Sequence, residues 1–219
     1  MELARRKSEA VALVALGRAL LDAGYMFVTV TPETHRRVSA RATERGSRNA
    51  VSLRDAFGWS RPFERSILPA LMMELACAAG VVVEDGPLLR STVRFSTLKG
   101  KLFVHSAYPT IASGAVFFGP DTYRFCALLD EELAGRGRAR CVVDVGCGSG
   151  AGGIVAAAYA ERVIFADING AALAFAEVNA ALAELNGRWC TAPCSRSSQT
   201  SWESTPADRW SGNRSRWET

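Results

Sequence analysis

The sequence predicts an α/β chain in two parts, in which a small, mainly helical α+β domain precedes an incomplete Rossmann-like domain. The main observation is the order of the second part, where two apolar strands alternate with two small-residue helices. This β-α-β-α order is the opening of a doubly wound parallel sheet. The 219 residues, 48% of them apolar, suffice for one large domain or two small ones.

The first stretch reads as two helices around an extended segment. Apolar residues recur at helical spacing over 8–22, and Gly24 is placed to end that helix. Residues 25–31 alternate between buried and exposed types, which predicts a short strand. Pro32 then opens a basic helix that we expect to run to Gly46, because proline is favoured at the first helical position.

The second stretch, residues 50–110, has the order helix, helix, strand, hairpin. This is the order of a winged helix, and the other interpretation is a small α+β domain that docks a substrate. Segments 91–94 and 105–110 are rich in polar groups and could line a substrate cleft, but we interpret His105 as an ordinary hairpin residue. The predicted elements are Leu53–Phe57, Pro62–Ala79, Val81–Val83, Val93–Ser96 and Leu102–Ser106.

The third stretch contains the parallel sheet. A helix leads into a buried strand, a glycine loop follows, and the pattern then repeats. The predicted elements are helix Thr122–Leu133, strand Cys141–Val145, helix Gly152–Ala160, strand Val163–Ala166 and helix Ala171–Leu185.

The last stretch has a different composition. After Leu185 there is no Leu, Ile, Val, Phe or Met, and we expect no buried strand beyond residue 187. Four of the five tryptophans of the chain fall there, at Trp189, Trp202, Trp210 and Trp217. We therefore divide the chain into 1–110, 111–187 and an atypical, disordered tail, 188–219.

Positive charge is concentrated at the start of the chain. Residues 1–60 contain ten Lys or Arg and six Asp or Glu, whereas residues 61–219 contain sixteen of each, so the net charge of +4 lies in the first part. A basic face can bind nucleic acid, but this surplus is small, and we favour a solvated helix face. The excess is largely in Arg36, Arg37, Arg41, Arg45 and Arg48.

The composition predicts a cytoplasmic protein without a membrane partner. No apolar run reaches the roughly 20 residues that span a membrane, and the basic start of the chain lacks an apolar signal core. The six cysteines fit reduced thiols. The two histidines, His35 and His105, are far apart in sequence, so we expect no metal site.

A glycine loop follows the first of the two buried strands. Gly146, Gly148 and Gly150 let the backbone approach a ligand closely, and carboxylates stand at Asp144 and Asp167, one in or after each strand. Such carboxylates suit a cofactor with an ammonium group and ribose hydroxyls. The loop also fits the GxGxxG fingerprint of a NAD site. NAD is the less favoured alternative, because an acidic residue inside the strand has no use opposite an anionic pyrophosphate.

These residues resemble a known enzyme family. Residues 143–150, Val-Asp-Val-Gly-Cys-Gly-Ser-Gly, resemble the first motif of class I S-adenosylmethionine (SAM)-dependent methyltransferases, and residues 165–169 resemble the second. Pro120-Asp121-Thr122 resembles a segment of the N-methyltransferase subgroup that contains release-factor glutamine methyltransferases and "small domain" rRNA methyltransferases. A helix N-cap at Asp121 or Thr122 is the alternative interpretation of that match.

The resemblance implies SAM as cofactor, N-methylation of a protein glutamine or an RNA or DNA base, and a protein or nucleic-acid methyl acceptor as partner. The Asn-Pro-Pro-Tyr motif, with which the family holds the target nitrogen, is missing, so no catalytic residue is assigned. We interpret the chain as C-terminally truncated or frameshifted, with little or no activity. The alternative is a non-enzymatic protein that binds nucleic acid weakly through its basic N-terminal domain. The implied cofactor-binding residues are Asp144, Gly146, Cys147, Gly148, Gly150, Asp167, Ile168 and Thr122.

Overall fold

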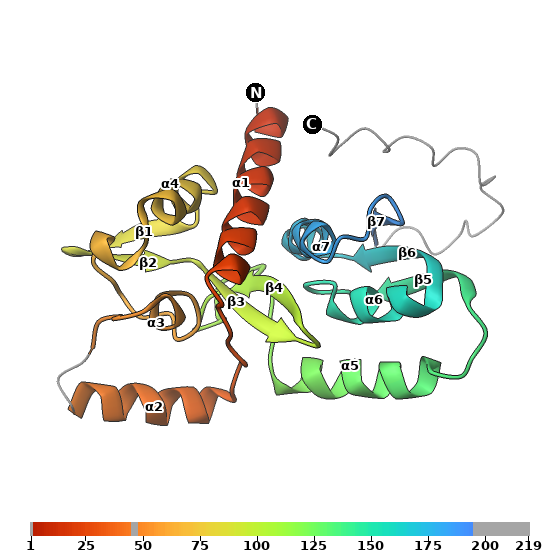
Figure 1. Cartoon of the computed structure of the whole chain (residues 1–219), viewed down its shortest axis with the longest axis horizontal. Helices are drawn as coiled ribbons and strands as arrows, with labels where there is room; N and C mark the ends of the chain where they lie inside the picture. Colours follow the sequence, from red (N-terminus) through yellow and green to blue (C-terminus); the bar gives the residue numbers. More distant parts are fainter. Residues whose placement is uncertain (1, 45–47, 195–219) are drawn as a thin grey trace.

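The computed structural model describes residues 2–44 and 48–194 (Figure 1). Helix α1 (Glu2–Asp22) stands between two halves of the molecule, with helices and a short hairpin on one side and a parallel sheet with its helices on the other. The predicted α/β class, with an incomplete Rossmann-like domain, is confirmed. Arg45 and Gly46, which the sequence places at the end of the basic helix, lie outside the described residues.

The N-terminal half contains four α-helices, a 3-10 turn and two antiparallel hairpins within the described residues. These elements are α1, α2 (Pro32–Glu44), α3 (Leu53–Phe57), η1 (Arg65–Ile67), α4 (Ala70–Ala78), β1 (Val82–Asp85), β2 (Leu88–Ser91), β3 (Val93–Leu98) and β4 (Lys101–Ser106).

The prediction of a strand over 25–31 is wrong, although the alternation behind it is real. Tyr25, Phe27 and Thr29 are buried, and the residues between them are exposed. The segment lies beside β3, but the two share one backbone hydrogen bond, from Thr97 N–H to the Phe27 carbonyl at 2.7 Å. A single bond gives an extended segment rather than a paired strand.

The helix predicted over 62–79 begins later than expected. Phe63 pairs instead with Leu89 of β2 as an isolated antiparallel bridge, and η1 follows. Helix α4 then begins directly after Pro69, which lacks the N–H that an interior helical residue would donate.

The predicted hairpin of residues 93–106 is confirmed as β3–β4. Lys99 and Gly100 form its turn with φ of +48° and +73°, the two positive angles that a type I′ turn requires. The two strands are largely buried, and the exposed residues are Lys99, Gly100 and Lys101 at the turn. The hairpin therefore cannot serve as the exposed wing of a winged helix.

The exposed hairpin is β1–β2, of which only β1 was predicted, as a strand over 81–83. Residues Asp85 to Leu88 close it, and Arg90 forms an ion pair with Asp85 at 2.6 Å. The two-residue loop is Gly86-Pro87, and Gly86 has a φ of +62°, which fits the glycine at the first central position of a type II′ turn.

The C-terminal half has the predicted β-α-β-α order and builds one parallel three-stranded sheet, β5-β6-β7. The small-residue helix is shorter than predicted, because its last turn is a 3-10 turn. The elements are α5 (Pro120–Leu133), β5 (Ala139–Val145), α6 (Ala151–Ala156), η2 (Ala157–Tyr159), β6 (Ala160–Asp167), α7 (Gly170–Leu182) and β7 (Trp189–Pro193).

Strand β7 forms beyond residue 187, where we expected no buried strand; none of its five residues is fully buried. It pairs with β6 in parallel from Trp189 opposite Val163 to Pro193 opposite Asp167. The Trp189 ring packs edge-on against Phe165 at 6.2 Å, so an aromatic ring supplies the apolar contact that the missing aliphatic residues would make. The rest of the predicted tail, residues 195–219, lies outside the described residues.

Two apolar cores meet at the β3–β4 hairpin and α7. Val178 of α7 belongs to the core of the N-terminal half, whereas Ala176 and Ala180 belong to the core around the parallel sheet. Helix α1 also lies close to α7, since a Cβ on Gly17 would come within 2.8 Å of Leu182. The two halves thus form one packed body.

His105, on β4, is buried between the two halves. Its Nδ1 donates to the Ser106 carbonyl at 3.1 Å, and its Nε2 therefore accepts from the Ser96 hydroxyl at 2.8 Å. The ring also stacks on Phe118. No helix in the described part of the chain is both long and apolar enough to cross a membrane.

Candidate functional site

The glycine loop connects β5 to α6 at the carboxyl end of the sheet. Gly146, Gly148 and Gly150 all have positive φ, at +69°, +52° and +79°, which residues with a side chain rarely adopt. A Cβ on Gly150 would come within 3.0 Å of the Cβ of Ala176. Gly150 is therefore needed for close packing, whereas a Cβ on Gly146 would meet open space.

Asp167, the last residue of β6, is fixed against the loop. Its Oδ2 accepts from Gly148 N–H and its Oδ1 accepts from Asn169 N–H, both at 2.9 Å. The residue is 9% exposed. Each carboxylate oxygen can accept a further hydrogen bond, so Asp167 keeps acceptor capacity at the mouth of the loop.

Asp144, on β5, lies on the other side of the loop. Its Oδ2 accepts from Gly153 N–H at 2.7 Å. Burial raises the pKa of this carboxyl above its usual value, and the charge of Asp167 acts in the same direction. A nearby cation would lower the pKa again and stabilise the ionised form.

A cavity of about 250 Å³ lies between the glycine loop and the start of α5. Asp121 and Asp144 are its two charged lining residues, and no lysine or arginine of the described part lines it. Its walls are formed by Phe117, Asp121, Thr122, Phe125, Asp144, Gly146, Cys147, Gly148, Ser149, Ala151 and Gly152. An acidic cavity is suited to a cationic ligand and unsuited to a pyrophosphate.

The Pro120-Asp121-Thr122 segment contributes to this cavity and begins a helix as well. Gly119 is the N-cap residue of α5, so the alternative in which Asp121 or Thr122 is the cap is wrong. Thr122 still supports the helix start, because its hydroxyl accepts from Gly119 N–H at 3.2 Å. Five predicted site residues in addition to Thr122 lie at or beside the loop: Asp144, Gly146, Cys147, Gly148 and Gly150.

The predicted residues that do not line the cavity are Gly150, Asp167 and Ile168. Asp167 is fixed beside Gly148, and Ile168 is 75% exposed outside the cavity. Cys147 lines it, but burial raises the pKa of its thiol to about 12. The thiol is therefore protonated at neutral pH and is no nucleophile.

Asn179, on α7, supports the loop from behind and was missed by sequence reasoning. The residue is fully buried. Its amide donates to the Ser149 carbonyl at 2.8 Å, and it exchanges two hydrogen bonds with the backbone of Val104 on β4. A single amide thus joins the glycine loop to the hairpin. An asparagine in a helix whose only other polar residue is Glu177 was the available signal.

Comparison with protein families identifies the C-terminal half. Residues 113–201 match the model of the methyltransferase small domain. The match covers the parallel sheet and its glycine loop, and it agrees with the resemblance of residues 143–150 to the first motif of class I SAM-dependent methyltransferases. A search of curated proteins found no match to the sequence.

Solved structures resemble parts of the chain at low identity. A tRNA methyltransferase of Methanocaldococcus jannaschii is 21% identical over 47% of this chain and 30% of its own length, with a TM-score of 0.38. A protein of the same organism in complex with adenosine is 19% identical over 47% of this chain and 30% of its own length, with a TM-score of 0.39. A transferase of Pyrococcus horikoshii is 16% identical over 76% of this chain and 51% of its own length, with a TM-score of 0.41. The chain therefore spans about a third to a half of these solved chains.

Proposed function

We propose that the chain binds SAM between the glycine loop and the start of α5, and that this site serves methyl transfer to a nitrogen acceptor. The observation that carries the proposal is the pair of carboxylates on either side of the loop. Asp167 has free acceptor capacity beside Gly148, and Asp144 lines a cavity to which no described lysine or arginine contributes.

The residues present fit this cofactor. SAM carries a ribose, an ammonium group and a methyl on a positively charged sulfur, which supplies the group to be transferred. Asp167 would accept hydrogen bonds from the ribose hydroxyls, and Asp144 would face the ammonium group. The open space in front of Gly146 leaves room for the ligand.

The remaining predicted residues would shape the site. Thr122 and the half-exposed ring of Phe117 form the wall opposite the glycine loop. Ile168 offers an apolar surface beside Asp167, where an adenine ring would pack. Methyl transfer is an in-line displacement, so the contribution of these residues is to hold the two reactants in the correct orientation.

Calorimetry with SAM, combined with a transfer assay that uses radiolabelled SAM with total RNA and release factors, tests the proposal. We expect SAM to bind and Asp167→Ala to weaken that binding roughly 30-fold. A wild-type chain that binds NAD but no SAM would contradict the proposal. The transfer assay measures activity separately, since no Asn-Pro-Pro motif is present to hold the acceptor nitrogen.

A further inference from the structure

A second, larger cavity of about 540 Å³ lies in the N-terminal half, beside α2 and the loop after α3. Its size falls within the range of small-molecule sites. Four arginines line it and no Asp or Glu of the described residues does. The lining consists of His35, Arg36, Ser39, Ala42, Thr43, Arg48, Trp59, Ser60, Arg61, Pro62, Arg90, Tyr108 and Pro109.

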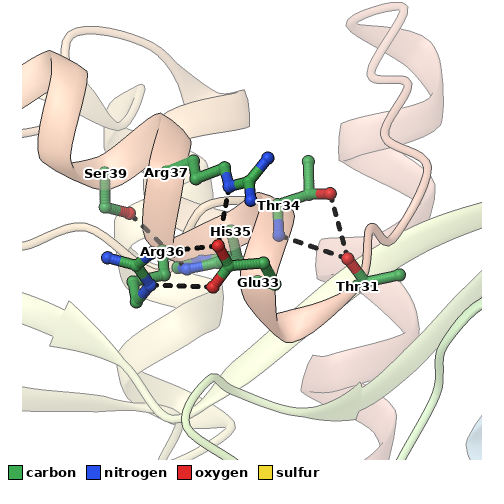
Figure 2. A network of polar contacts seen from close by, with 7 residues as sticks. All are labelled: Thr31, Glu33, Thr34, His35, Arg36, Arg37 and Ser39. Atoms are coloured by element: carbon green, nitrogen blue, oxygen red, sulfur yellow. Dashed lines mark hydrogen bonds and ion pairs between the residues drawn. The ribbon is translucent and has the colours of Figure 1, made fainter.

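Three of the lining arginines are held by carboxylates that lie outside the cavity wall. Glu33 accepts from Arg36 at 2.8 and 2.9 Å and also from Arg37 at 2.6 Å, as Figure 2 shows. Arg61 donates to Asp55, and Arg90 donates to Asp85 and to the Ser60 carbonyl. These contacts fix the guanidinium groups in place and offset part of their charge, while each group keeps further N–H donors for an anion.

A buried charge behind the cavity adds a second observation. Arg94 is 3% exposed and donates from Nε to the carbonyl of Gly58, the residue before Trp59. Its Nη2 is buried without a hydrogen-bond partner among the described residues, and no carboxylate there pairs with it. Arg94 does not line the cavity, but its charge acts on the lining residues His35 and Tyr108. A buried charge without a counter-ion is unfavourable, so an anion bound beside these residues would partly offset it.

The cavity also offers aromatic faces. His35 and Tyr108 stack with ring centroids 4.0 Å apart, and Trp59 lies 5.4 Å from His35. Arginines bind phosphates through paired N–H groups, and aromatic rings stack on unpaired bases. An acidic peptide would use the charges but not the rings.

We propose that this arginine-lined cavity binds a phosphate and an adjacent base of single-stranded nucleic acid. The loop between β4 and α5 joins it to the cofactor cavity, since it places Tyr108 in one and Phe117 in the other. The bound strand would be the methyl acceptor, and in that respect alone the inference rests on the proposed function.

The test uses the full chain and a short, fluorescein-labelled single-stranded oligoribonucleotide, with binding followed by anisotropy in the absence of SAM. Arg36 and Arg48 are exposed, so Arg36→Gln with Arg48→Gln should preserve the fold. We expect this double variant to bind roughly tenfold more weakly and to show a shallower dependence on salt. Tyr108→Leu keeps the charge and should weaken binding by roughly fivefold.

The matched control is Arg41→Gln with Arg124→Gln, which removes the same charge from exposed positions outside the cavity. Arg41 lies on α2, about 200° around the helix from the lining residue Ser39. The control should bind as the wild type does. An equal loss in both double variants, or equal affinity for polyglutamate, would overturn the proposal.

Calorimetry with SAM on the same variants separates this inference from the proposed function. The Arg36→Gln, Arg48→Gln variant should bind SAM as the wild type does. Failure of SAM to bind any of these proteins would overturn the proposed function and leave the nucleic-acid site standing. Failure of the wild type to bind the oligonucleotide would overturn the nucleic-acid site and leave the proposed SAM site standing.

Discussion

The two cavities of this molecule are opposite in charge and differ in how the chain builds them. Among the described residues, the charged residues that line the cavity at the glycine loop are aspartates, whereas those that line the cavity beside α2 are arginines. The first comes mainly from two short segments, 117–125 and 144–152. The second gathers residues from five separate stretches of the N-terminal half. Local motifs can predict a site of the first kind but not one of the second.

The largest expected effect comes from breaking the tight packing of the glycine loop. Gly150→Val places a side chain at φ +79°, within 3.0 Å of Ala176, and should lower the free energy of unfolding by about 3 kcal/mol. Urea denaturation measures this change. Gly146→Ala is the control with positive φ but open space, and should lower it by about 1 kcal/mol. Equal losses in the two variants would show that packing at Gly150 is unimportant.

Removal of the Asp167 carboxylate should weaken SAM binding at the glycine loop. Asp167→Ala leaves Gly148 N–H and Asn169 N–H without their acceptor, and we expect SAM affinity to fall by about 2 kcal/mol, or roughly 30-fold. Calorimetry measures the affinity. Glu161→Ala, an exposed position on the same strand, should leave it unchanged. Unchanged SAM affinity in Asp167→Ala would place the cofactor elsewhere.

The charge of the acidic cavity should also appear as a pH dependence. Because the pKa of Asp144 is raised by burial, its carboxyl is protonated at a higher pH than an ordinary aspartate. SAM, a cation, should therefore bind more weakly as the pH falls. Asp144→Asn should bind about tenfold more weakly at pH 8 and lose most of the pH dependence. A variant that keeps the wild-type profile would exclude Asp144 from the site.

The hairpin between the cavities should make the whole molecule sensitive to acid. Burial lowers the pKa of His105 to about 3, so the folded state keeps the ring neutral while the unfolded state binds a proton below its ordinary pKa. Stability is thus complete above about pH 6.5 and is lost as the pH falls, by up to about 1.4 kcal/mol per pH unit. His35, whose pKa is also lowered by burial, adds in the same direction.

Urea unfolding at pH 7 and at pH 5.5 measures this loss of stability. His105→Gln should reduce the difference between the two pH values, and the residual difference belongs largely to His35. Identical curves for the wild type at both pH values would contradict the buried, neutral state of His105.

The elements around the glycine loop were predictable because their signals are local. The positions of Gly146, Gly148 and Gly150 are set by the backbone angles they adopt, and Asp144 and Asp167 follow at the ends of two apolar strands. The parallel β5-β6 pair followed from the same pattern. Cys147 was predicted as a site residue because it lies in the motif. That its thiol is protonated follows from its burial, which the sequence does not show.

The parts that sequence reasoning missed depend on contacts between distant segments. Strand β7 lacks aliphatic residues, and the Trp189 contact with Phe165 takes their place. The basic cavity joins Arg36 to Arg90 and Tyr108 across a long stretch of chain. The arginine surplus in residues 1–60 was visible in the sequence. Which of these arginines line one cavity depends on the fold and could not be predicted from it.

Calorimetric titration of the wild-type chain with SAM, and separately with NAD, tests the central claim most directly. An acidic cavity beside a glycine loop should bind the cationic cofactor and reject the anionic dinucleotide. We predict measurable SAM binding that Asp144→Asn weakens, and no measurable NAD binding. Binding of NAD with an affinity equal to or greater than that of SAM would contradict the account.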